Sequence, residues 1–346
     1  MAATELMREA LRPLYRAAND AHPGLLIQRG FEQYDEENKT AKTAHLQRIC
    51  AIPAGDFYHN AYQRWRTATA DVRRFRQVIL ALESRLFIGL TGGGLLETGC
   101  AISHTYGMPY IPGSSIKGVV RAHVSGSLFA RQHPAVIDEL FGAAADPTGE
   151  QRDGLAGLVS FHDAWWVPGS APASDKNRPL VEEIVTTHHL DYYGNEGATP
   201  ASDLDSPVPN AQIAVQGSFL FVLEAPANAL GWLDVAEQML LAALASRGIG
   251  AKTRTGYGLF DPAPLVPAAP TCAWVDETIA RLAQQNRAST DDTLRGKGLV
   301  NEWAALTDAA LKAAALADIQ SRWQAKGWWE QSLTGAAKYA KAIYTQ

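Results

Sequence analysis

The sequence contains little cysteine and no long apolar run. Its three cysteines, Cys50, Cys100 and Cys272, are scattered and form no CxxC pair. This spacing disfavours a disulfide framework and a cysteine-ligated zinc site, and it favours a reducing cytoplasm. No uncharged apolar stretch is long enough to span a membrane. The N-terminus mixes acids with bases, unlike a secretory signal. We therefore expect a cytoplasmic protein.

The sequence also lacks an excess of positive charge. The formal net charge is -5 over 346 residues, which disfavours coating of nucleic acid by the whole surface. A local basic groove stays possible, because salt screens charges beyond about 8–10 Å. The length suits about two domains of roughly 150 residues, and a hydrophobic content of 47% supports a sizeable core.

A glycine-rich stretch at 247–258 contains three cations and no acid. Glycines permit positive φ and close backbone approach to an anion, and cations attract phosphate. A Walker A loop is excluded because Ala251 precedes Lys252. A dinucleotide fingerprint is excluded because Thr253 replaces the third glycine and a predicted strand follows. A plain helix-to-strand turn and an anion-binding loop both remain possible. The residues concerned are Arg247, Gly248, Gly250, Lys252, Thr253, Arg254, Gly256 and Gly258.

A second stretch, at 105–123, predicts an extended approach followed by a helix. Ser114 or Ser115 is a suitable N-cap. Lys117 and Arg121 lie four residues apart and share a helix face. The N-terminus of a helix attracts anions, so this stretch suits a phosphate. An ordinary capped helix with two exposed cations is the alternative.

A histidine–tyrosine segment at 187–194 is the third candidate. Adjacent histidines on an extended chain point to opposite faces, which disfavours a metal site; we expect no metal and no cofactor. An acid–base role for His188 or His189 in RNA cleavage remains possible, since histidine titrates near neutrality. The neighbouring Tyr192 and Tyr193 favour an RNA-facing or packing role, because aromatic rings stack on bases.

The order of predicted elements divides the chain into three parts. Residues 1–76 are mostly helical and are expected to pack on the core. Residues 77–262 contain strand–helix–strand twice, the order of a ferredoxin-like unit, in which one sheet face and the loop after the second helix can grip RNA. Residues 168–215 form an insertion much longer than a typical loop of about 4–6 residues. Residues 263–346 are a Pro/Ala linker and a helical appendage.

These motifs resemble a known family. Gly107–Gly118 with Arg121 resembles the helix-start motif of the RAMP superfamily of CRISPR systems, and Gly248–Gly258 resembles its glycine-rich loop. Within that superfamily the chain most resembles subunit six of the type III-B Cmr effector complex. Further similar segments are His22–Ile27, Val159–Ala164 and Thr187–Tyr193, although Thr187 stands where that family usually has proline. The resemblance covers residues 20–262 and leaves the appendage unexplained.

The resemblance implies an α+β fold with a ferredoxin-like (RRM-like) RAMP domain, an N-terminal helical region and a C-terminal helical appendage. It implies a non-catalytic subunit of an RNA-targeting complex in antiviral defence. Such a subunit binds the 3′ part of the guide RNA (crRNA) and caps the backbone filament. Its implied partners are target RNA, neighbouring RAMP subunits and the small helical subunit, and the insertion is a candidate thumb between guide and target.

Because some RAMP relatives cut RNA without a metal, a metal-independent endoribonuclease that processes guide RNA is the alternative. In either reading the sequence names a set of candidate contacts. The predicted RNA-binding residues are Ser114, Ser115, Lys117, Arg121, His188, Tyr192, Arg247, Gly248, Gly250, Lys252, Thr253, Arg254 and Gly256.

Overall fold

The computed structural model describes residues 4–17, 21–34, 39–90, 96–145, 154–172, 176–265, 272–329 and 334–344. The chain forms two compact units, Met1–Leu265 and Val266–Gln346. Each unit is described by itself below. The three-part division at residues 76 and 262 stays a prediction.

The first unit begins with short helices. They are a 3-10 helix at Glu9–Leu11, α1 (Arg12–Ala17), α2 (Pro23–Arg29), α3 (Lys39–Cys50) and α4 (Asp56–Ala68), while β1 (Thr4–Glu5) pairs with β2 (Gln33–Tyr34). The predicted helical run up to Arg76 is therefore too long. The hydroxyl of Thr69, at the end of α4, donates to the carbonyl of Trp65 at 2.9 Å, and Phe75 and Arg76 already belong to the next strand.

The central sheet is antiparallel. Its order is β3 (Phe75–Ala81), β9 (Ser218–Glu224), β6 (Ala164–Trp166) and β4 (Tyr110–Ile111), and β5 (Ser160–Phe161) also pairs with β9. On the other edge of β3, Phe260 bridges Leu82 and Leu265 bridges Ile79. A helix follows β3 and another follows β9, so this is the order of a ferredoxin-like unit. The predicted α+β, ferredoxin-like fold is confirmed.

Helices cover both faces of this sheet. Side chains alternate between faces along a strand. Val78 and Leu80 face a core shared with α5 (Gly113–Ser125) and α9 (Gly231–Ser246). Ile79 faces the opposite way and packs in a second cluster with Tyr62 and Trp65 of α4. The sheet face expected to grip RNA is thus covered by α4, which corrects that expectation.

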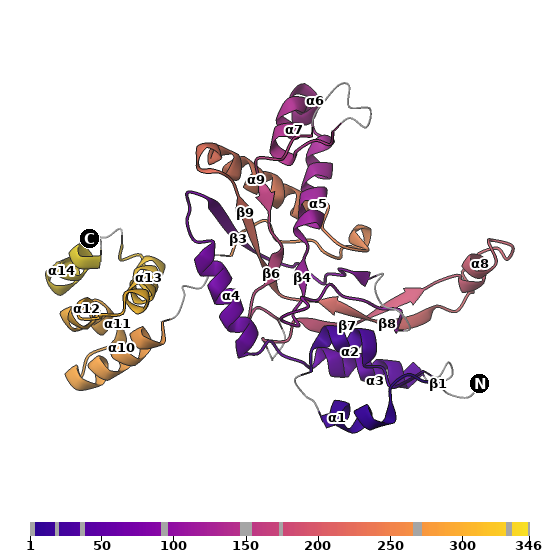
Figure 1. The fold of residues 1–346 in the computed structure, drawn as a ribbon, viewed down its shortest axis with the longest axis horizontal. Helices are drawn as coiled ribbons and strands as arrows, with labels where there is room; N and C mark the ends of the chain where they lie inside the picture. The colour runs from indigo at the N-terminus through magenta and orange to yellow at the C-terminus, as the bar shows by residue number, and fades with distance from the viewer. Residues whose placement is uncertain are drawn as a thin grey trace. The chain divides into compact units, whose positions relative to one another are not determined.

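The long insertion contains an antiparallel β-hairpin. β7 (Leu180–Thr187) pairs with β8 (Val208–Val215) in continuous register, from Leu180 opposite Val215 to Thr187 opposite Val208. Figure 1 shows α8 (Leu190–Gly194) at the far end of the hairpin, away from the central sheet. Both strands of the hairpin pack against α3. The remaining elements of this unit are α6 (Leu128–Gln132), α7 (Pro134–Phe141) and 3-10 helices at Ala227–Ala229 and Thr253–Thr255.

The second unit is helical and has its own core. It consists of α10 (Ala273–Asn286), α11 (Thr290–Leu294), α12 (Lys297–Ala304), α13 (Ala309–Ala325) and α14 (Gly335–Tyr344). Val275, Leu299 and Trp323 are fully buried in one cluster. Asp318 is also fully buried, and its carboxylate accepts from Arg322 and from the backbone N–H of Cys272. In the described parts of both units, no helix is long and apolar enough to cross a membrane.

Candidate nucleic-acid interface

The first predicted motif opens α5, but its cap differs from the prediction. Pro112 is the N-cap residue, and no side chain caps the helix by a hydrogen bond from that position. The Asp163 carboxylate accepts the Gly113 N–H at 2.7 Å instead. Ser114 and Ser115 therefore lie inside the first turn rather than at the N-cap. Ser114 is exposed and Ser115 half-buried, so both remain candidate contacts.

The two cations of α5 differ in their surroundings. The Lys117 side chain is half-buried and forms no hydrogen bond or ion pair within the described part of the chain. Arg121 donates to the Gly142 carbonyl at 3.1 Å and lies 3.5 Å from the Asp138 carboxylate of α7. Lys117 is therefore free to meet a phosphate, whereas Arg121 also holds α7 against α5.

The glycine-rich stretch forms a tight loop between α9 and the edge of the sheet. Its backbone is hydrogen-bonded to the segment that follows β3. The Ala251 N–H donates to the Phe87 carbonyl at 2.8 Å, and the Gly258 N–H donates to the Arg85 carbonyl at 2.7 Å. The Ser84 hydroxyl donates to the Gly256 carbonyl at 2.9 Å. All four glycines have positive φ, and Lys252 also adopts the left-handed conformation, with φ of 59°. These bonds fix the shape of the loop.

The cations of this loop point to solvent. Arg247, Lys252 and Arg254 are exposed, and none forms an ion pair or a side-chain hydrogen bond with any residue that the structure describes. Thr253 is half-buried beside them. The loop thus presents uncompensated positive charge on a fixed backbone, which attracts a phosphate chain irrespective of sequence.

The two motifs meet through their helices. Ser246, at the end of α9, has its hydroxyl 3.3 Å from His123 of α5, and the Arg247 guanidinium lies beside Gly126, the C-cap of α5. Lys117 lies nine residues before Gly126, roughly 13 Å along the helix axis. The structure therefore packs the motifs together at the C-terminal end of α5, and no described contact joins Lys117 to the loop.

The third motif lies at the tip of the β7–β8 hairpin. His189 adopts a left-handed backbone, with φ of 57°, and its Nδ1 lies 2.8 Å from the Asp205 carboxylate. The hydrogen bond with His189 holds the pKa of Asp205 below its usual value. His188 is exposed, and the Tyr192 and Tyr193 rings meet edge to face with 40% and 70% of their surfaces exposed.

The tip therefore offers aromatic surface to a partner, and it contains one ordered histidine–carboxylate pair. In the described residues no group of three or more His, Cys, Asp and Glu side chains could hold a metal ion.

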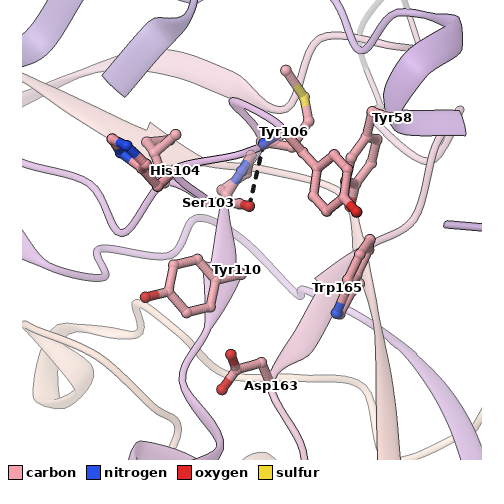
Figure 2. Close-up of a pocket in the computed structure, with 10 residues that line it drawn as sticks. Tyr58, Ser103, His104, Tyr106, Tyr110, Asp163 and Trp165 are labelled. Atoms are coloured by element: carbon pink, nitrogen blue, oxygen red, sulfur yellow. Dashed lines mark hydrogen bonds between the residues drawn. The ribbon is translucent and has the colours of Figure 1, made fainter. Parts of the chain in front are cut away.

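A cavity of about 290 Å³ was missed by the sequence reasoning. It lies between the segment 102–110, α4, Asp163 and Trp165 of β6. Figure 2 shows Tyr106, Tyr110, Trp165, Asp163 and Ser103 around it. Tyr106 and Tyr110 belong to the stretch that precedes α5, so two closely spaced tyrosines were visible in the sequence. Only the fold brings them to Trp165 and Asp163.

Comparison with known proteins identifies the family. A sequence model of the RAMP superfamily matches residues 79–261, which is more than half of the chain. The chain belongs to the RAMP superfamily. The matched region contains α5, the β7–β8 hairpin and the glycine-rich loop.

Two curated RAMP relatives are similar to this chain. The CRISPR system Cmr subunit Cmr6 of Pyrococcus furiosus is 26% identical over 285 residues, covering 68% of this chain and 82% of the relative. The CRISPR system CMR subunit Cmr6 of Saccharolobus solfataricus is 25% identical over 185 residues, covering 53% of this chain and 56% of the relative.

Solved structures are similar over comparable shares. A cryo-EM structure of the type III-B Cmr-β complex bound to cognate target RNA contains a chain that is 22% identical. The match covers 66% of this chain and 76% of that one, with a TM-score of 0.47. The crystal structure of Cmr6 from Pyrococcus furiosus is 27% identical, with a TM-score of 0.29. That match covers 54% of this chain and 97% of the other.

Proposed function

We propose that this RAMP protein is a non-catalytic subunit of a type III-B CRISPR (Cmr) RNA-targeting effector complex. In this role it binds the 3′ part of the guide RNA and caps the backbone filament in antiviral defence, in the cytoplasm. The observation that carries the proposal is the similarity to Cmr6 of Pyrococcus furiosus across 68% of this chain.

The distribution of charge supports an RNA-binding role. The chain is acidic overall, with a formal net charge of -5. Even so, Lys117, Lys252 and Arg254 have no carboxylate partner in the described structure. Uncompensated cations beside a fixed backbone attract phosphates, and screening by salt confines that attraction to the local surface. We therefore assign these three side chains to the guide-RNA backbone.

The hairpin supports the second part of the proposal. Its tip presents His188 and Tyr192 at a distance from the central sheet (Figure 1). Exposed aromatic rings stack on unpaired bases. We assign the β7–β8 hairpin to a thumb that separates guide from target RNA. Neighbouring RAMP subunits and the small helical subunit are the proposed protein partners.

RNA-binding measurements at several salt concentrations test the assignment. Each phosphate contact on a single strand adds about 0.7 to the slope of log affinity against log salt. Lys117→Ala, Lys252→Ala and Arg254→Ala are each expected to weaken binding about five-fold near 0.1 M salt and to flatten that slope by about 0.7.

Lys338→Ala is the matched control, because Lys338 is an exposed lysine on α14 of the other unit and pairs with no residue that the structure describes. Affinity and slope that stay unchanged in all three variants would remove these residues from the interface.

The endoribonuclease alternative rests on one observation, the His189–Asp205 pair, since a carboxylate can orient a histidine for proton transfer. The same binding mixtures, run on a denaturing gel after long incubation, separate the two functions. We expect the RNA to stay intact with the unmodified protein. Cleavage by the pure chain would favour the alternative.

A further inference from the structure

The 290 Å³ cavity is lined in part by aromatic rings, those of Tyr58, Tyr106, Tyr110 and Trp165. The Trp165 and Tyr106 rings are 5.3 Å apart at 47°, and Tyr58 stacks on Trp165 at 5.9 Å and 14°. The Tyr58 hydroxyl donates to the Trp166 carbonyl at 2.6 Å, which fixes its ring. Tyr58 is buried and, with Trp65, stacks on Trp165, so the surface open to the cavity is that of the half-buried Tyr106 and Tyr110 and the remainder of Trp165. Aromatic surface of this kind is where nucleic-acid bases stack.

The segment 102–110, which carries Tyr106 and Tyr110, is held in place by backbone hydrogen bonds. Within this segment, the Ser103 N–H donates to the Met108 carbonyl at 2.9 Å, and the Gly107 N–H donates to the Ser103 carbonyl at 2.9 Å. The ring Nε2 of His22, from α2, lies 3.1 Å from the same Ser103 carbonyl. A wall that is already ordered loses little conformational entropy when a ligand enters.

The polar groups at the cavity favour a hydrogen-bond donor. Asp163 is exposed at the lower edge of the cavity in Figure 2, and one of its oxygens accepts the Gly113 N–H. Its second oxygen has no partner among the described residues. The amino groups of adenine, cytosine and guanine can donate to that oxygen. Uracil has no amino group, and its N3–H donor lies between two carbonyl oxygens that a carboxylate repels.

Size and position agree with a single base. Ligand pockets usually span about 300–1,000 Å³, so this cavity lies just below that range and suits a small group such as one base. Asp163 also caps α5, the helix that carries Ser114 and Lys117. A nucleotide whose phosphate meets the start of α5 would have its base beside the cavity. Proteins that read RNA sequence do so at such unstacked single-strand bases.

We propose that this cavity binds one nucleobase with an exocyclic amino group, extruded from the bound RNA strand. The aromatic rings stack on the base, and the free oxygen of Asp163 accepts its amino group. The site gives the protein a base preference in addition to its sequence-independent hold on phosphates. The inference rests on the RNA-binding role proposed above, and its test separates the two.

The experiment compares two short single-stranded RNAs, an all-uridine oligomer and the same oligomer with one central adenosine. The full-length protein is expected to bind the adenosine oligomer about ten-fold more tightly, as fits one hydrogen bond to a charged acceptor. Asp163→Asn keeps an oxygen for the Gly113 N–H and replaces the free oxygen with an amide donor. The preference is then expected to disappear or to turn toward uridine.

Asp308→Asn is the matched control, because Asp308 also accepts a backbone N–H at a helix start, from Leu311. It is expected to keep the preference. Equal binding of both oligomers by the unmodified protein overturns the base site and leaves RNA binding standing. Binding of neither oligomer overturns both. A preference that survives Asp163→Asn also contradicts the inference.

Stacking of the base in the cavity can be measured separately from affinity. Placing 2-aminopurine at the central position reports stacking as a loss of fluorescence. We expect that loss with the unmodified protein and a smaller loss with Tyr106→Leu. Fluorescence that does not change on binding of the RNA contradicts the inference.

Discussion

The four glycines of the 247–258 loop all have positive φ, but side chains are excluded from them for two different reasons. At Gly250 a Cβ atom would overlap the Phe87 carbonyl, which accepts the adjacent Ala251 N–H. At Gly256 a Cβ atom would meet nothing within 4 Å, so only its φ of 92° requires glycine. Gly258 resembles Gly250, because a Cβ atom there would overlap the Ile249 carbonyl, so close packing constrains the loop on both sides of Gly256.

This contrast predicts different costs for the same substitution. Gly256→Ala is expected to lower the unfolding free energy by about 1 kcal/mol, the cost of one strained backbone conformation. Gly250→Ala adds a displacement of the backbone around Phe87, and the expected loss is about 3 kcal/mol. Urea unfolding of the two variants measures the difference. Equal losses would show that the Gly250 backbone relaxes freely.

Residue-level prediction failed where partners are distant in sequence. Ser114 and Ser115 suit the N-cap by local preference, but the Gly113 N–H is satisfied by Asp163, 50 residues away. Adjacent histidines were expected to point apart, yet the left-handed backbone of His189 places its ring beside Asp205. Local sequence patterns contain no information about either partner.

At the scale of elements, the strands of the β7–β8 hairpin pack against α3, where Lys42 donates to Asn210 and Gln47 donates to Glu182, and the tip beyond these strands is exposed. No described side chain between His188 and Pro207 is buried, while Thr187 lies opposite Val208 in the register. The tip therefore contributes little burial to the stability of the unit, and its exposed rings are available to a partner.

Replacing residues 188–207 with Asn-Gly tests the role of the tip, because this pair suits a two-residue hairpin turn. The melting temperature is expected to shift by about 3 °C or less, equivalent to about 1 kcal/mol. RNA affinity is expected to fall about ten-fold through the loss of base stacking. A variant that keeps the hairpin but replaces Tyr192 and Tyr193 with serine serves as the control for folding. Unchanged affinity would exclude the tip from the interface.

Elements whose signal is local were predicted well. The apolar run Gln216–Leu223 predicts a strand and the apolar stripe of Trp232–Ser246 predicts a helix, and the structure has them at Ser218–Glu224 and Gly231–Ser246. The apolar pattern of Gln77–Leu90 predicts one strand, but β3 ends at Ala81, because Leu86 and Phe87 pair with Val215 and Ala251. Such pairings join distant segments, and hydrophobic periodicity cannot reveal them.

The whole molecule combines a RAMP unit with a separate helical unit. The family match ends at residue 261, and the second unit has its own buried core around Val275 and Trp323. Basic side chains lie over aromatic rings there, such as Arg295 over the half-buried Trp328 at 4.4 Å. The proposed RNA contacts all lie in the first unit, so we assign guide binding to that unit alone.

The central claim is that this chain works inside a guide-RNA complex, and purification from its native host tests it most directly. The tagged chain is isolated under gentle salt, and the proteins and small RNAs that accompany it are identified. We expect other RAMP subunits to accompany the chain, together with RNAs of uniform length that contain guide sequences. Recovery of the chain alone, without RNA or other RAMP subunits, would contradict it.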